Sequence, residues 1–231
     1  MHLSLRVATL LAFSLALLPS AVRASGGSSL PPASFPSGQT APQKSPEQQA
    51  IDSYNAGVKS RDKALGLEKE ASNTSDVKER TKLEKKARKE FEKAVTQFQT
   101  ATQKNPAFYQ AYNDLGFSRR KTGDYDGALE AYNRGLSLAP GYPPAVEYRA
   151  EAYLALERVE DAKQAYVDLF SGDRGRADEL MAAMKGWIEK RRIDPGKVSP
   201  EALKEFAAWV DQREQIAKQT PSLSELQHRN W

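Results

Sequence analysis

The chain of 231 residues contains no cysteine, and only two histidines, three methionines and three tryptophans. Without cysteine, disulfide bonds and thiolate nucleophiles are excluded, and so are the usual zinc and haem sites given so few histidines. His2 lies in an apolar N-terminal segment and His228 lies near the C-terminus, so no Ser–His or Cys–His pair can form on a rigid frame. The fourteen glycines are scattered and form no phosphate-binding loop. We therefore expect no catalytic residue, metal or cofactor.

Long apolar runs are absent except at the N-terminus. Val7–Leu18 is almost wholly apolar, follows a short basic start and precedes the small-residue sequence Val22–Ala24, the pattern of a cleavable signal peptide. We expect residues 1–24 to direct export, with the periplasm as the compartment and full secretion as an alternative. A retained N-terminal anchor is the other interpretation. No other segment could span a bilayer, so we expect no stable membrane insertion after cleavage.

The charge balance gives no indication of a nucleic-acid partner. The formal net charge is +4, and Arg6 and Arg23 of the predicted signal peptide contribute half of it. The remaining charges are spread evenly, unlike a basic nucleic-acid-binding patch. Residues 25–46 are rich in Gly, Ser and Pro and predict a flexible linker.

From residue 47 to residue 170, small and aromatic residues recur with a period of 34. Such a period is typical of stacked helical hairpins. The recurring residues are Ala94, Ala128 and Ala162; Phe98, Tyr132 and Tyr166; Pro106 and Pro140; and Gly116 with Ala150.

The central unit, residues 107–142, resembles a tetratricopeptide repeat. The resemblance implies an all-α superhelix of antiparallel helix pairs, whose first helices line a concave, protein-binding face. The next unit, 143–170, departs from the pattern with Arg149 in place of a leucine and Glu157 in place of the turn glycine. The residues that carry the resemblance in the central unit are Tyr112, Leu115, Gly116, Tyr125, Ala128, Tyr132 and Pro140.

The upstream unit, residues 47–106, is longer than a standard hairpin. Gly57 resembles Gly116, yet it precedes Ala94 by 37 residues, whereas Gly116 precedes Ala128 by 12. We expect an elongated hairpin whose helices are each extended by about three turns. The extension is either a partner-binding arm or a solvated spur, because its charges also fit a plain exposed face.

Residues 171–218 predict two amphipathic helices that cap the array, and residues 219–231 predict a mobile tail. The predicted fold is therefore all-α: a short solenoid of about three antiparallel helix pairs with an elongated first hairpin and C-terminal capping helices. The residues expected to pack the repeats together are Ala94, Phe98, Tyr112, Leu115, Gly116, Ala128, Tyr132, Pro140, Ala150, Ala162 and Tyr166.

The repeat pattern also projects a partner-binding groove. Phe117 is the strongest candidate, as an exposed aromatic residue on the concave wall, and Arg120 and Lys121 beside it suit a peptide with an acid and an apolar anchor. The full set of groove candidates is Gln110, Asn113, Phe117, Arg120, Lys121, Glu147, Glu151 and Leu154.

The predicted function is a non-enzymatic, exported scaffold that holds a partner protein or peptide in this groove during cell-envelope assembly, secretion or maintenance. One alternative is a structural homo-oligomer assembled through the elongated hairpin. Another is a carbohydrate-active enzyme with two catalytic carboxylates, which would require a deep acidic cleft.

Overall fold

A computed structural model describes residues 44–220, which form eight helices and their connecting turns, with no strand among them. The predicted signal peptide, most of the linker and residues 221–231 lie outside the described residues. No helix between residues 44 and 220 is long and apolar enough to cross a membrane. The helices are α1 (Pro46–Asn73), α2 (Val77–Lys104), α3 (Tyr109–Thr122), α4 (Tyr125–Leu138), α5 (Pro143–Ala155), α6 (Val159–Gly172), α7 (Arg174–Ile193) and α8 (Pro200–Gln219).

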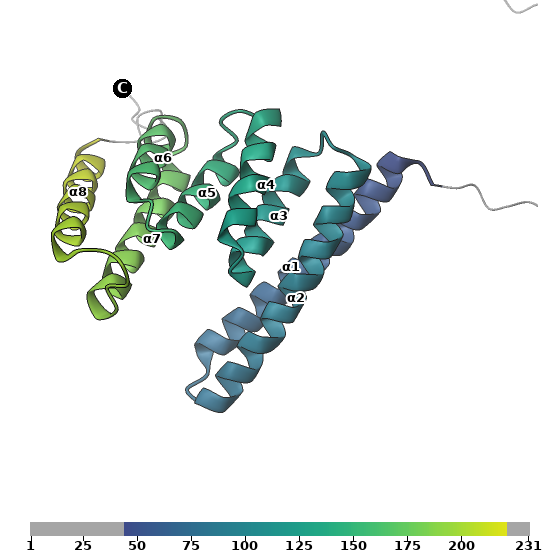
Figure 1. Cartoon of the computed structure of the whole chain (residues 1–231), viewed down its shortest axis with the longest axis horizontal. Helices are drawn as coiled ribbons and strands as arrows, with labels where there is room; N and C mark the ends of the chain where they lie inside the picture. The colour runs from purple at the N-terminus through teal and green to yellow at the C-terminus, as the bar shows by residue number, and fades with distance from the viewer. Residues whose placement is uncertain (1–43, 221–231) are drawn as a thin grey trace, which may run out of the picture. The chain divides into compact units, whose positions relative to one another are not determined.

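Successive helices pair antiparallel and the pairs stack side by side, from the α1–α2 hairpin to α8 (Figure 1). Each odd-numbered helix also contacts the next odd-numbered helix, so that α1, α3, α5 and α7 form one layer. This arrangement confirms the predicted all-α solenoid of helix pairs.

Within the first two pairs, a glycine of the first helix faces an aromatic ring of the second. A Cβ added at Gly57 would lie 2.6 Å from Cε1 of Phe98, and one added at Gly116 would lie 2.6 Å from Cε1 of Tyr132. Both rings are fully buried. The glycines lie 59 residues apart in the sequence, which is one period of 34 plus the 25 extra residues of the first hairpin.

The other residues expected to pack the repeats lie mostly in the core. Tyr112 is half-buried, and Pro140 is exposed in the turn between α4 and α5. Gly116 aside, the other eight residues of this set are buried. They are Ala94, Phe98, Leu115, Ala128, Tyr132, Ala150, Ala162 and Tyr166.

The elongated first hairpin is confirmed. Helices α1 and α2 each contain 28 residues, twice the length of α3, so each gains about 21 Å at 1.5 Å per residue. Small residues recur every seven positions along α1 and are buried, which lets α2 approach closely. They are Ala50, Gly57, Ala64 and Ala71.

The turn between α5 and α6 places a glutamate in the left-handed region. Glu157 has φ +61°, one period after Gly123 with φ +89°, so it does occupy the position of the turn glycine. A side chain there costs roughly 1–2 kcal/mol. The Glu157 carboxylate lies 3.2 Å from Nη2 of Arg191 and accepts a hydrogen bond from the amide of Lys197, which ties this turn to α7 and the loop after it.

Helices α7 and α8 close the other end of the stack. Helix α7 packs against both α5 and α6, and α8 packs against α7. Their apolar stripes are buried, with Met184 and Trp187 of α7 meeting Phe206 and Val210 of α8 in one core cluster. At 20 residues, α7 outlasts the 13-residue α5. In Figure 1 the C-terminal end of α7 and the turn of the α1–α2 hairpin therefore both extend beyond the short turns between them.

Candidate partner-binding face

The side of the molecule formed by α1, α3, α5 and α7 is called the odd-helix face. Gln110, Asp114, Phe117 and Lys121 follow each other at spacings of four, three and four along α3, so they share one side of that helix. Asp114 and Lys121 pair with residues of α1, which places this side of α3 on the odd-helix face.

Two ion pairs join α1 to α3. Nη1 of Arg61 lies 2.9 Å from Oδ1 of Asp114, and Nζ of Lys121 lies 2.6 Å from Oε2 of Glu68. Asp114 is buried, so its partner is needed to offset the cost of removing its charge from water.

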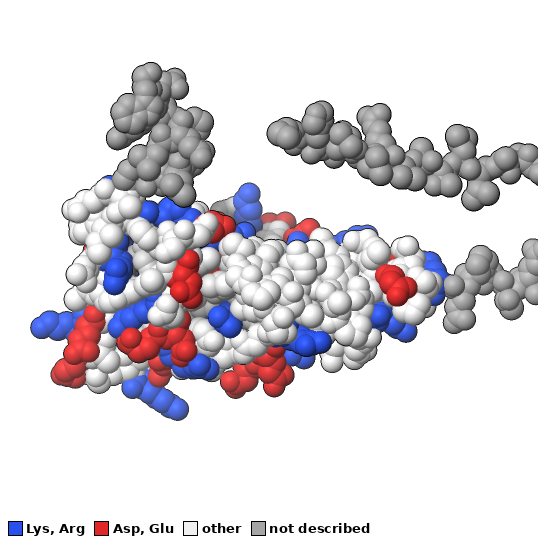
Figure 2. All heavy atoms as spheres, turned by 90° about the horizontal axis from the view of Figure 1, so that it is seen from above, with Lys and Arg blue, Asp and Glu red and all other residues white. Residues whose placement is uncertain are grey.

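The next two junctions are bridged in the same way. Nη1 of Arg120 on α3 lies 2.5 Å from Oε2 of Glu151 on α5, and Nη1 of Arg176 on α7 lies 2.6 Å from Oε2 of Glu147 on α5. Each contact between neighbouring odd-numbered helices thus carries at least one ion pair. The pairs are neutral, and Figure 2 likewise shows acidic and basic side chains interspersed on the surface seen from above.

Aromatic rings lie between these charges. The rings of Phe117 and Tyr148 pack 5.0 Å apart between centroids, and Cζ of Arg120 lies 5.4 Å and 5.7 Å from the two rings. Arg176 lies over the same tyrosine, at 5.6 Å. These cation–π contacts stabilise the positions of both guanidinium groups.

Burial perturbs the two acidic groups at the base of this face. Burial raises the pKa of Glu147 to about 7, against the opposing effect of its hydrogen bond from Arg176. Burial also raises the pKa of Asp114, although the charge of Arg61 opposes it. Both carboxyl groups therefore depend on their arginine partners to stay ionised.

These contacts correct two sequence-based expectations. Phe117 is half-buried instead of exposed, because Phe91 contacts it edge-on from α2 and Tyr148 covers it from α5. Arg120 and Lys121 are not free to bind an acidic partner, because Glu151 and Glu68 already pair with them. A partner carboxylate would have to displace a partly buried internal one.

The remaining candidates are placed as follows. Asn113, Glu147 and Leu154 are buried, with 5%, 3% and 3% of their surface exposed, so they support the face from beneath. Gln110 and Glu151 are half-buried.

A cavity of about 680 Å³ opens where α3 and α5 end beside α7. The sequence-based candidates Arg120, Glu151 and Leu154 line it, together with residues of the C-terminal half of α7 such as Gly186 and Trp187. The α7 residues were missed because the 34-residue pattern stops before α7. The only feature that could have indicated them is the length of α7, which exceeds that of a repeat helix such as α5.

Two family models described as tetratricopeptide repeat match the chain, over residues 83–143 and 119–187. Together they reach from α2 into α7. A search of curated proteins found no match. A solved structure titled "Crystal structure of MamA protein" is similar, with 19% sequence identity and a TM-score of 0.33. That similarity covers 66% of this chain and 99% of the other.

Proposed function

We propose that the chain is a non-enzymatic scaffold that binds a partner protein or peptide on its odd-helix face. The first support for this proposal is that residues 83–187 belong to the tetratricopeptide repeat family. Repeat arrays of this kind bind partners on the extended surface that their stacking creates. The observation that carries the proposal is the row of ion pairs joining α1, α3, α5 and α7. Such a face is ordered before binding, which lowers the entropic cost of association.

The ion pairs of the acidic residues on this face support a non-enzymatic role. Asp114, Glu147 and Glu151 each have an arginine nitrogen within 2.9 Å. A glycosidase-like site instead needs one carboxylic acid and one carboxylate facing a common substrate. On the odd-helix face the carboxylates serve the contacts between helices.

Export to the cell envelope is part of the same proposal and rests on the apolar N-terminal segment. N-terminal sequencing of the protein purified from its natural host tests it. A mature protein beginning at or near Ser25 is expected, and an intact N-terminus on the cytoplasmic side would contradict export.

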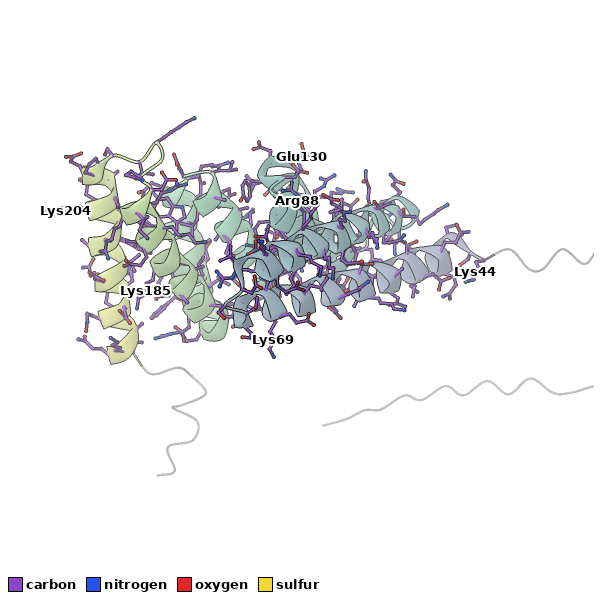
Figure 3. All side chains as sticks on the ribbon, turned by 90° about the horizontal axis from the view of Figure 1, so that it is seen from below. Lys44, Lys69, Arg88, Glu130, Lys185 and Lys204 are labelled. Carbon is purple, nitrogen blue, oxygen red and sulfur yellow. The ribbon has the colours of Figure 1, made fainter. Side chains whose placement is uncertain are left out.

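Site-specific photocrosslinking in the host cell tests partner binding. A photoreactive amino acid replaces Gln110 on the odd-helix face or, as the matched control, Glu130 on α4. The Glu130 side chain is 81% exposed and lies on the side of the molecule opposite Lys69 of α1 in Figure 3. A discrete adduct from position 110 that is absent from position 130 is expected. Equal adducts from both positions, or none from position 110, would refute binding on this face.

The alternative function, a homo-oligomer built through the α1–α2 hairpin, is tested by shortening that hairpin. Glu68 pairs with Lys121, and Arg88 donates to the carbonyl of Thr122, so the hairpin is tied to the end of α3 at these two residues. A short glycine-rich turn in place of residues 69–87 removes only the part beyond them. Sedimentation velocity of both forms is expected to show monomers. An oligomer that dissociates on shortening would favour the alternative.

A further inference from the structure

The cavity at the end of α5 exists because α7 does not stop where a repeat helix would. Helix α5 ends at Ala155 after 13 residues, whereas α7 continues to Ile193 after 20. The last two turns of α7 therefore stand beside the ends of α3 and α5 and form one wall of the cavity. Its volume of about 680 Å³ lies within the range typical of ligand pockets.

The lining of the cavity combines apolar and small residues with five charged side chains. Leu154 and Trp187 of the lining are almost fully buried, and the small residues Ala155 and Gly186 also line the cavity. At Gly186 an added Cβ would meet no atom within 4 Å. Ile193, also in the lining, is 87% exposed, more than any other large apolar side chain among residues 44–220. A ligand that covered Ile193 would gain free energy from its burial.

Three of the five charged side chains in the lining form ion pairs within the fold. Arg120 pairs with Glu151, and Arg191 pairs with Glu157. Asp194, which also lines the cavity, accepts a hydrogen bond from the amide of Gly196.

Lys190 lies on the last turn of α7. It lines the cavity, and among residues 44–220 no carboxylate lies within 4.0 Å of its ammonium group. The cavity therefore offers apolar side chains beside the unpaired ammonium group of Lys190, and its lining also includes the carboxylate of Asp194.

We propose that this cavity is a specificity pocket for a partner polypeptide, which it binds by one large apolar side chain next to a carboxylate that pairs with Lys190. The inference rests on the proposed scaffold function and deepens it, because the pocket opens on the odd-helix face at Arg120 and Glu151. The sequence predicted the same ligand chemistry but placed it at Phe117, Arg120 and Lys121. The structure supports its transfer to α7, because the charges of Arg120 and Lys121 are already paired.

The probe is a library of random nine-residue peptides displayed on phage and selected on the full chain. Wild type is expected to enrich peptides with a large apolar residue next to Asp or Glu. The best peptide, synthesised with a fluorophore, is then titrated against the variants. Gly186→Phe fills the pocket without a clash at Cβ, and should weaken binding about tenfold or more. Gly66→Phe is the matched control, because Gly66 also has no atom within 4 Å of an added Cβ.

A charge reversal tests the role of Lys190. Lys190→Glu should weaken the acidic peptide about threefold, the scale of an exposed ion pair, and should strengthen a version whose acid is replaced by lysine. Circular dichroism of each variant before and during heating verifies that it is folded, and a variant that unfolds early is replaced by Gly186→Leu. No dependence on charge at position 190 would refute the carboxylate part of the proposal.

The outcomes separate the pocket from the scaffold function. Peptides that bind Gly186→Phe as tightly as wild type, or enrichment without an apolar and acidic pair, would refute the pocket. The scaffold function then stands if the photocrosslinker at Gln110 captures a partner, and falls if it captures none. Equal loss of binding in Gly66→Phe and Gly186→Phe would show a non-specific effect of the phenylalanine and would also refute the pocket.

Discussion

Replacing Gly116 by alanine should destabilise the protein, although alanine is the better helix former. Gly116 lies in the middle of α3, where its lack of a side chain lets the Tyr132 ring of α4 lie against the backbone. The added Cβ would lie 2.6 Å from Cε1 and 2.7 Å from Cδ1 of that ring. Because the ring is fully buried, either it or the helix has to move.

Two opposing effects set the size of the change in the free energy of unfolding. Forcing an extra carbon into a packed core costs about 1–3 kcal/mol, whereas alanine in place of a helical glycine contributes about 1 kcal/mol of stability. We expect a net loss of about 1–2 kcal/mol. The variant should still fold, because the third pair already combines a buried Ala150 with a buried Tyr166.

Urea denaturation followed by circular dichroism measures the free energy of unfolding. Gly66→Ala on α1 is the control, since its Cβ meets no atom within 4 Å, and it should gain up to about 1 kcal/mol. In a Tyr132→Leu background the penalty of Gly116→Ala should largely disappear, because the clashing ring atoms are gone. The packing argument is refuted if Gly116→Ala is as stable as Gly66→Ala, or if the penalty persists without the ring.

Three further predictions concern the charged groups. Because the folded-state pKa of Glu147 is raised to about 7 from a reference of 4.5, the folded state binds this proton more tightly than the unfolded chain. The stability from Glu147 is therefore full below pH about 4.5 and is lost as pH rises through 7, by up to about 3 kcal/mol. Glu147→Gln should flatten the change in unfolding free energy between pH 5 and pH 8, and an unchanged slope would contradict the assignment. Arg120→Glu should cost about 3 kcal/mol, because it sets two acids together, and adding Glu151→Arg should restore most of the loss in urea titrations. Glu157→Gly should be more stable than Glu157→Gln by about 1 kcal/mol in thermal unfolding, because both lose the ion pair but only glycine relieves the left-handed backbone.

The sequence was sufficient to predict the fold because repeat packing is local and periodic. The helix-pair architecture requires a small residue opposite an aromatic ring at a fixed spacing, and Gly116 with Tyr132 meets that requirement visibly in the sequence. The extra length of the first hairpin was equally readable, as the distance from Gly57 to Ala94. The sequence aligns Glu157 with the turn glycine Gly123 as a departure from the pattern, and the left-handed backbone at Glu157 is a finding of the structure.

Periodicity predicts which side of a helix faces its neighbours, but not which charges pair on the odd-helix face. Periodicity indicates which side of α3 faces α1 and α5, and in the structure Arg120 and Lys121 pair with residues of these two helices. It does not indicate which charges meet across neighbouring helices, because Glu68 and Glu151 lie 53 and 31 residues away from their partners. Pairing of this kind depends on the stacking geometry between pairs, which no local spacing encodes.

Partner specificity should depend on residues that neither stack the repeats nor pair across the odd-numbered helices. Residues that repeat are needed for stacking, and residues that pair across the odd-numbered helices are needed for rigidity, so neither group is free to select a ligand. The groups left over arise where α7 departs from the repeat: Gly186 leaves open space, Ile193 is exposed, and Lys190 is unpaired within the described chain. Substitutions at these three residues should therefore change which peptides bind while leaving the free energy of unfolding nearly constant, whereas a substitution at Gly116, which is absent from the lining, should do the reverse.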